Sequence, residues 1–377
     1  MTGVEAIVDV DAVVAAAATD AASWEHTGLP AATIALMARG GLLAPDRPKE
    51  FGGHGVGAHE LGTIAARLGS ACTSVRSLFT VQGMVAAAVD RWGTADQRAR
   101  WLPAMTDGSV IAGLAATESN AGSDLSGIHT TFERDGAQWR LSGRKLWVTF
   151  GAVADVLLVL GRGPAGPMVA LVRTDRPGLT VEPVHGQLGM RGARIAHIAL
   201  DRVVVPDRDV LGRPGFGLSH LIATALDHGR YTIAWGCLGM AQACLADSRE
   251  HAARRAQGSV VLADHETVRA TLGRSWVDVA SARALCERAA DQRAAREPAA
   301  ILGTVVAKYA AARAAAVVSE RAVQLLGAAG CAPDSRAGRY FRDAKIMQII
   351  EGAREVAELD IGDHVLRAPI EPGGAPL

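Results

Sequence analysis

A lone glutamate in an apolar stretch and a polar, glycine-containing turn are the features of this sequence best suited to chemistry. Glu351 stands between Ile350 and Gly352, where a carboxylate is costly to bury unless a raised pKa has a use. Residues 114–124 read L-A-A-T-E-S-N-A-G-S-D, a turn that lets backbone N–H groups approach a flat, anionic cofactor. Together the two predict a flavin site with a base that removes a proton from carbon.

Two more segments extend this pattern into a family resemblance. Residues 143–149 read G-R-K-L-W-V-T, and residues 340–352 read Y-F-R-D-A-K-I-M-Q-I-I-E-G. The chain thereby resembles the acyl-CoA dehydrogenase family, whose motifs are T-E-x-x-A-G-S-D, G-x-K-x-W-I-T, and Y-R-D-A-K followed by I-x-E-G-T. Taken alone, Thr117 and Ser123 would be interpreted as turn residues whose hydroxyls form local hydrogen bonds with the backbone. The ordered set of motifs makes the resemblance specific.

The resemblance implies FAD as the cofactor. In such a site Trp147 would lie against the flavin ring, Thr149 would bond near its reactive N5 face and Thr117 near its pyrimidine side. Further contacts within the same subunit would come from Leu114, Ala116, Gly122, Ser123, Gly352, Ala353 and Glu355. The chain departs from the family pattern at Ser119 and Asn120, where Pro and Gly are common, and Ala353 stands where Thr is usual.

The resemblance also implies that a second copy of the chain completes the flavin site. Arg255, judged by its spacing to the D-H-E of 264–266, matches an arginine that in the family reaches the flavin pyrophosphate of a neighbouring subunit. The phenylalanine that usually follows this arginine is absent here, and the alternative is a solvated arginine on a helix. Gln324, with Ala328 in place of a second glycine, would hold the ADP part across the dimer. A homodimer or homotetramer is therefore expected.

The same resemblance makes Glu351 the catalytic base. A hydrogen alpha to a thioester carbonyl is too weakly acidic for an exposed carboxylate, so the base must be desolvated and the carbonyl polarised. In the family, the backbone N–H at the position of Glu351 and a ribityl hydroxyl polarise that carbonyl. Arg230 ends the segment L-D-H-G-R, matches the family's D-x-x-R and would lie near the base; pairing with an acidic neighbour is the alternative. Ser123 is also expected to contact substrate.

Arg76 is expected to influence the choice of acyl group. It belongs to the segment C-T-S-V-R-S-L-F-T-V-Q-G-M over 72–84, which lies where the family shapes the pocket for the acyl tail. An arginine there would be unfavourable for an alkyl chain and favourable for a short polar or carboxylated acyl group. An exposed surface arginine is the alternative.

Three blocks of different periodicity predict the elements that position these residues. Helical spacing runs from about 13 to 105, short β-branched runs separated by Gly and Pro occupy 111–212, and helical segments follow at about 218–256, 264–292, 298–327 and 338–368. This order indicates an α+β fold like that of the family. We expect an N-terminal α-helical domain over 1–110, a middle antiparallel β-barrel or sandwich over 111–213 and a C-terminal four-helix bundle over 214–377. Residues 161–166 match G-x-G-x-x-G, but the prolines at 164 and 167 and the following strand predict a hairpin rather than a dinucleotide fold.

The composition argues against several kinds of partner. The 39 basic residues equal the 39 acidic ones and the pI is near 7.2, which gives no sign of nucleic-acid or anionic-membrane binding. We find no stretch of about 18 residues apolar and uncharged enough to span a bilayer, and the N-terminus lacks the basic start of a signal peptide, so a cytoplasmic location is expected. The five cysteines are scattered, which predicts buried thiols, no disulfide framework and no metal site.

These features lead to one leading hypothesis and two alternatives. The leading hypothesis is an FAD-dependent dehydrogenase that oxidises a short polar acyl thioester on an acyl carrier protein, because segments 72–84, 121–126 and 349–352 most resemble the dehydrogenases that help build hydroxymalonyl or methoxymalonyl extender units for polyketide synthases. The first alternative is a conventional short-chain or dicarboxylic acyl-CoA dehydrogenase, since coenzyme A presents the same phosphopantetheine arm. The second is a non-catalytic flavin-binding or assembly protein on the same fold. The electron acceptor leaves no signature in the sequence.

Overall fold

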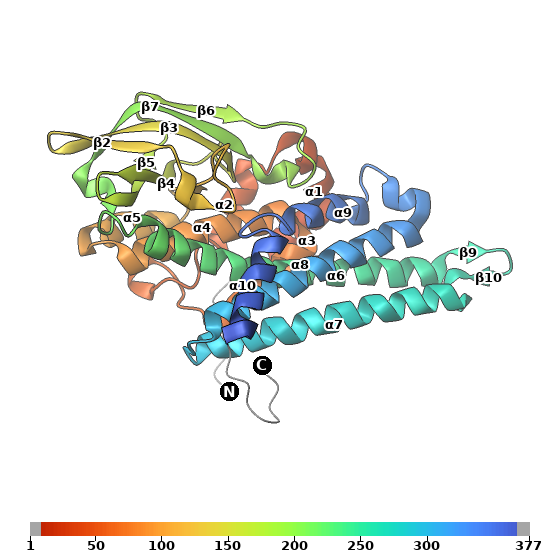
Figure 1. Cartoon of the computed structure of the whole chain (residues 1–377). Coiled ribbons are helices and arrows are strands. Elements are labelled where there is room, and N and C mark those ends of the chain that lie inside the picture. The colour runs from red at the N-terminus through yellow and green to blue at the C-terminus, as the bar shows by residue number, and fades with distance from the viewer. Residues whose placement is uncertain (1–8, 368–377) are drawn as a thin grey trace, which may run out of the picture.

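The computed structural model of the chain describes residues 9–367 and shows a layered arrangement of helices, a β-sheet and a further set of long helices (Figure 1). The N-terminal helices are α1 (Asp11–Thr27), α2 (Ala31–Arg39), α3 (Ala58–Ala71), α4 (Thr73–Trp92) and α5 (Ala95–Thr106). α5 begins at a capping box, in which Thr94 and Gln97 bond each other's backbone N–H. The expected order of helical, β and helical parts is confirmed.

Helix α4 is buried on all sides. Every residue from Thr73 to Val89 is buried, because one part of the helix packs under the sheet and the other against the C-terminal helices (Figure 1). Small residues permit close packing between two neighbours of α4, which are α3 and the later helix that carries Gly236. A Cβ on Gly69 of α3 would come within 2.3 Å of the carbonyl oxygen of Gly236, so this helix contact requires glycine.

The middle part is one eight-stranded sheet. Its strands are β1 (Ala112–Ala115), β2 (Thr131–Asp135), β3 (Gln138–Val148), β4 (Val156–Gly163), β5 (Gly166–Arg173), β6 (Leu179–Pro183), β7 (Ala196–Pro206) and β8 (Val210–Leu211). The order is β6-β7-β3-β2-β4-β5-β8, with β1 beside β4. Most neighbours are antiparallel as expected, but β1 and β2 each pair with β4 in parallel, so the sheet is mixed. The hairpin predicted at 161–166 is confirmed, since Gly163 pairs with Gly166.

Strand β4 explains the long apolar run of the β region. Val156, Leu158 and Leu160 belong to a core shared with α4 and α5, whereas Leu157 and Val159 belong to a second core on the other face of the sheet. A strand covered on both faces reads as continuously apolar rather than alternating.

The C-terminal part contains α6 (Ala223–Arg254), α7 (Glu266–Ala294), α8 (Ala300–Leu326), α9 (Arg336–Met347) and α10 (Arg354–Arg367), with the short strands β9 (Ala256–Gln257) and β10 (Val260–Val261) between α6 and α7. A π-helix, Gly217–Ile222, precedes α6. The segment expected as one helix over 338–368 is instead two helices. The chain leaves the helix at 348–353, where Glu351 and Gly352 both have positive φ angles, 55° and 102°.

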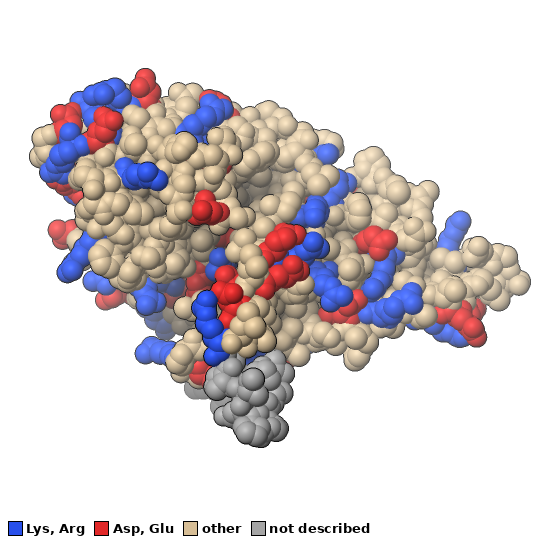
Figure 2. Space-filling model, in the orientation of Figure 1, with Lys and Arg blue, Asp and Glu red and all other residues tan. Residues whose placement is uncertain are grey.

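Two sequence expectations are corrected here. Ala300–Cys331 does satisfy the length and hydropathy of a membrane span, but half of its most apolar window is buried in the chain and α8 packs against α6, α7 and α9, which is the pattern of a core helix. Cys331 is exposed, unlike the other four cysteines, because it lies in the turn after α8. Figure 2 shows basic and acidic side chains interspersed over one face of the molecule, in keeping with the balanced composition.

Candidate functional site

The polar turn after β1 is held by a buried ion pair. Lys145 Nζ lies 2.7 Å from Glu118 Oε1 and 3.1 Å from the Ala116 carbonyl oxygen. The Glu118 carboxylate also accepts the backbone N–H groups of His129 and Thr130. Burial would raise the pKa of Glu118, but these hydrogen bonds lower it to about 2. The Glu and Lys of the two sequence motifs therefore fix the turn to β3.

A β-bulge near the end of β3 joins the same two motifs through the backbone. Lys145 pairs with Ile198 and Val148 with Ala196, so an extra residue is accommodated between them. The Leu146 N–H donates to the carbonyl oxygen of Thr117 at 2.9 Å. The turn 117–124 and the end of β3 are thus neighbours in space, as the predicted flavin site requires.

The residues predicted for FAD present groups suited to it. Trp147 is 54% exposed, so its indole is available for stacking against a planar group. The hydroxyls of Thr117, Ser123 and Thr149 make no hydrogen bond within residues 9–367, and a Cβ on Gly122 would meet no atom within 4 Å. Leu114 is half-buried on β1, and Ala116, just after this strand, is buried. The exposed indole, the free hydroxyls and the open glycine all belong to these two neighbouring segments, and together they fit a flavin.

The turn between α9 and α10 is clamped by two cations from different helices. Arg230 Nε on α6 donates to the carbonyl oxygen of Glu351 at 2.9 Å, and Lys308 Nζ on α8 donates to that of Gly352 at 2.8 Å. The backbone N–H groups of Glu351 and Gly352 have no acceptor in the described chain. Arg230 was expected near the base and lies there, bonded to the main chain rather than to a carboxylate.

The Glu351 side chain is placed to act as a base near neutral pH. Its Oε2 atom is inaccessible to solvent and has no hydrogen-bond partner in residues 9–367. Burial raises its pKa from 4.5 to about 7, although the charges of Arg230, Lys308 and Arg76 lower it. Burial also lowers the pKa of Lys308 to about 8. Beyond the turn, Ala353 is half-buried and Glu355 is exposed and bonded to Arg354.

Arg76 is not a surface residue. Its side chain is 1% exposed, and it takes part in no ion pair in the described chain. One terminal nitrogen lies 3.3 Å from Thr80 Oγ1, the other 2.9 Å from Met347 Sδ, and Nε has no partner. Thr80 Oγ1 in turn lies 3.0 Å from Thr232 Oγ1. A buried guanidinium whose only partners are a hydroxyl and a thioether retains donors for an anion.

Helix α4 connects the two halves of the site. At one point Gln82 Oε1 accepts the N–H of Ala112 at the start of β1, while its amide nitrogen donates to Met105 and Val110. Two turns earlier, Arg76 reaches Met347 at the end of α9, next to the Glu351 turn.

The three residues predicted to act across a subunit boundary lie on the surface, far along their helices from the Glu351 turn. Arg255, Gln324 and Ala328 are all exposed. Arg255 follows the end of α6, beside β9 at the tip of the molecule (Figure 1), and about 25 residues of helix separate it from Arg230, which is roughly 37 Å at 1.5 Å per residue. Gln324 lies about 16 residues, or roughly 24 Å, beyond Lys308 on α8. The structure does not bring them to the Glu351 turn of the same chain.

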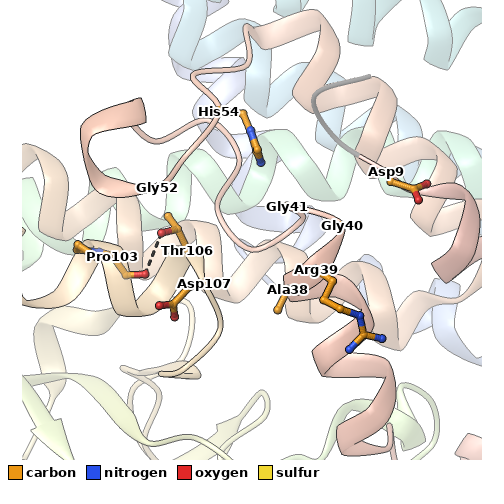
Figure 3. A pocket seen from close by; sticks show the side chains of 10 residues that line it. All are labelled: Asp9, Ala38, Arg39, Gly40, Gly41, Gly52, His54, Pro103, Thr106 and Asp107. Atoms are coloured by element: carbon orange, nitrogen blue, oxygen red, sulfur yellow. Dashed lines mark hydrogen bonds between the residues drawn. The ribbon is translucent and has the colours of Figure 1, made fainter. Parts of the chain in front are cut away.

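A separate pocket of about 450 Å³ opens on the N-terminal helices (Figure 3). Its lining includes Arg39, Asp9 and Asp107 together with His54, and the Thr106 hydroxyl donates to the carbonyl oxygen of Phe51 or Pro103. It contains none of the residues singled out from the sequence.

Comparison with known proteins bears on this geometry. Models of the N-terminal, middle and C-terminal domains of acyl-CoA dehydrogenases match residues 9–109, 113–203 and 217–366. The chain belongs to the acyl-CoA dehydrogenase family. It is therefore an FAD-dependent oxidoreductase that acts on a CH–CH bond.

Individual relatives cover nearly the whole chain. The mitochondrial short-chain specific acyl-CoA dehydrogenase of Mus musculus is 32% identical over 91% of this chain and 84% of its own length. The structure of FkbI, described as acting in biosynthesis of the methoxymalonyl extender unit of the polyketide Fk520, is 36% identical with a TM-score of 0.89, covering 95% of this chain and 99% of its own. A glutaryl-CoA dehydrogenase of Mycobacterium smegmatis in complex with FADH2 is 25% identical with a TM-score of 0.89, covering 97% of each chain.

Several residues of this member of the acyl-CoA dehydrogenase family were not assigned roles from the sequence. Lys308 lies in an Ala- and Val-rich helix, with no local signal that it reaches the Glu351 turn. Glu118 and Lys145 are motif residues, but only the fold shows that they pair. Thr80 and Thr232 come from different helices, so their contact leaves no sequence pattern.

Proposed function

We propose that this enzyme oxidises a short acyl thioester bearing a polar or anionic group, carried on the phosphopantetheine of an acyl carrier protein, in the formation of a hydroxymalonyl or methoxymalonyl extender unit. The buried, unpaired Arg76 is the observation that supports this substrate class most directly. An alkyl tail would leave its free N–H donors unsatisfied, whereas a hydroxyl or carboxylate would accept hydrogen bonds from them. The similarity to FkbI supports the carrier-protein role.

In the proposed reaction Glu351 removes the proton alpha to the thioester carbonyl. Its raised pKa matches a proton acceptor working near neutral pH. The free backbone N–H of Glu351 is available to polarise the carbonyl, and Arg230 and Lys308 hold the turn that presents it. FAD, when bound, accepts the hydride from the beta carbon. Where that carbon carries a hydroxyl, the resulting double bond is an enol, the tautomer of a beta aldehyde.

The positions of Arg255 and Gln324 support a cofactor site shared between two copies of the chain. Both are exposed and far along their helices from the Glu351 turn. Contact of these side chains with the same FAD therefore needs a second subunit, and we propose a homodimer or a homotetramer. Sedimentation analysis tests this, since a flavin-loaded monomer would contradict it.

A second candidate function is that of a conventional short-chain or dicarboxylic acyl-CoA dehydrogenase. The same Arg76 favours a dicarboxylic substrate, and one similar structure is a glutaryl-CoA dehydrogenase, whose named substrate carries a terminal carboxylate. The similarity to short-chain specific acyl-CoA dehydrogenases supports a conventional short-chain acyl-CoA substrate.

Anaerobic bleaching of the flavin's visible band separates these functions. The series compares 2,3-dihydroxypropionyl groups on an acyl carrier protein and on coenzyme A with butyryl-CoA and glutaryl-CoA. Bleaching by the carrier-bound hydroxyacyl group alone supports the proposal, and bleaching by butyryl-CoA or glutaryl-CoA refutes it in favour of the second candidate. Arg76→Met should weaken reduction by the polar substrate by at least tenfold, with Arg76→Lys intermediate. Glu351→Gln should retain FAD and lose reduction.

A further inference from the structure

The bulge in β3 leaves one backbone donor that the sheet does not satisfy. Lys145 pairs with Ile198 and Val148 with Ala196, so Leu146 and Trp147 both lie opposite His197 of β7. The Leu146 N–H turns to the polar loop after β1. The Trp147 N–H donates to Nδ1 of the His197 side chain at 3.2 Å. The imidazole therefore takes the place of a missing carbonyl acceptor in the sheet.

The same imidazole also contacts the Trp147 ring. The two ring centroids are 5.2 Å apart and the rings are nearly perpendicular, at 88°, an edge-to-face arrangement that aromatic pairs favour. Trp147 has a φ of 58°, a strained value for a residue with a bulky side chain. Because more than half of the indole is exposed, few other contacts fix its direction. His197 thus holds Trp147 at its backbone and at its ring.

This arrangement requires a defined protonation state. A backbone N–H can only donate, so Nδ1 of His197 must accept and its proton must reside on Nε2. An imidazolium has donors at both nitrogens and cannot make this bond. The charged groups on the strands beside His197 are Glu182, its direct neighbour on β6, and Arg144, whose guanidinium bonds that carboxylate at 2.8 Å. The Lys145 side chain is directed to Glu118 instead.

We propose that His197 is a positioning residue that fixes Trp147 against the flavin ring, and that it does so only as the neutral Nε2–H tautomer. The inference rests on the proposed placement of Trp147 at the flavin. It adds a residue outside the three sequence motifs, and distant in sequence from Glu351, to those that hold FAD.

Three substitutions isolate the accepting atom. His197→Asn keeps an oxygen near the position of Nδ1, His197→Gln moves the amide outward, and His197→Phe keeps an aromatic edge without an acceptor. His185→Phe is the matched control, since His185 is exposed and lies in the connection between β6 and β7, before the strand that carries His197. FAD dissociation constants are measured by diluting the holoenzyme, together with the position of the visible flavin band.

At about pH 8, His197→Gln and His197→Phe should weaken FAD binding about fivefold, the equivalent of roughly one hydrogen bond at ~1 kcal/mol, and shift the flavin band. His197→Asn and the control should match the unaltered enzyme. Equal affinities and spectra for all variants, or an Asn variant as weak as Phe, would overturn the proposal. No substrate is used, so failure of the acyl-group assignment would leave this result unchanged.

Discussion

Titration of Glu351 gives the sharpest quantitative test of the active-site geometry. Burial raises the pKa of this carboxyl to about 7, and only the carboxylate can accept a proton from substrate. The rate of anaerobic flavin reduction should therefore rise about tenfold per pH unit at acid pH and level off above about pH 7. Stopped-flow measurements from about pH 5 to about pH 9 with saturating substrate give the midpoint.

Substitution of Lys308 should move that midpoint in a defined direction. The positive charge of Lys308 lowers the pKa of Glu351, so Lys308→Met should raise the midpoint, by up to about one pH unit. The variant also loses the 2.8 Å bond to the Gly352 carbonyl oxygen, so the plateau rate should fall. Lys345→Met is the control, because Lys345 is an exposed lysine on α9. A midpoint near the ordinary value of 4.5, or a shift to lower pH in Lys308→Met, would refute the reasoning.

Ionisation of Glu351 should also make the stability of the folded enzyme depend on pH. A carboxyl with a raised pKa in the folded state favours folding below its unfolded pKa, and this contribution is lost as the pH rises through the folded value. For Glu351, a shift from 4.5 to about 7 amounts to roughly 3 kcal/mol. The thermal midpoint of Glu351→Gln, relative to the unaltered enzyme, should thus increase between about pH 5 and about pH 8. A constant difference would indicate that Glu351 is solvated.

Three further predictions concern Gly236, the buried Glu118–Lys145 ion pair and the cysteines. In Gly236→Ala the new Cβ would lie 2.7 Å from Cδ of Arg76. Substrate titration should therefore show binding of polar acyl groups about tenfold weaker or more, with FAD retained. Unchanged affinity would show that Arg76 does not contact the acyl group. Glu118→Gln leaves the buried Lys145 cation without its counter-charge, which should cost about 3–5 kcal/mol, lower the thermal midpoint and weaken FAD binding. In the native enzyme a thiol reagent should label Cys331 and leave the four buried cysteines unreacted until the protein is unfolded.

Features that depend on local sequence were predictable, whereas features made by packing were not. The β4–β5 hairpin follows from Pro and Gly between β-branched runs, and the placement of the turn at 117–124 beside β3 agrees with the two motifs. The break at Glu351 could not be predicted from the sequence, because apolar spacing continues through 346–350 and cations on the distant helices α6 and α8 help to hold the turn. Local spacing carries no information about partners on distant helices.

The parallel pairings of β4 could not be predicted from the sequence either. Its continuous apolar run predicted a strand, but the run alone does not say which neighbours lie on each side. The burial of Arg76 was likewise undecided from the sequence, since an arginine in a helix is usually exposed. Its position became clear only when α4 proved to be enclosed on every side.

The enclosure of α4 restricts how this enzyme can change its substrate in evolution. The helix that carries Arg76 also anchors β1 through Gln82 and has no solvent-facing residue from Thr73 to Val89. A mutation that reshapes the acyl end therefore alters side-chain volume inside a close-packed core that also supports the cofactor strand. New acyl preferences should arise mainly through volume-conserving exchanges at Arg76 and Thr80, accompanied by stabilising mutations elsewhere. Substrate range and thermal tolerance should consequently be linked among descendants of this sequence.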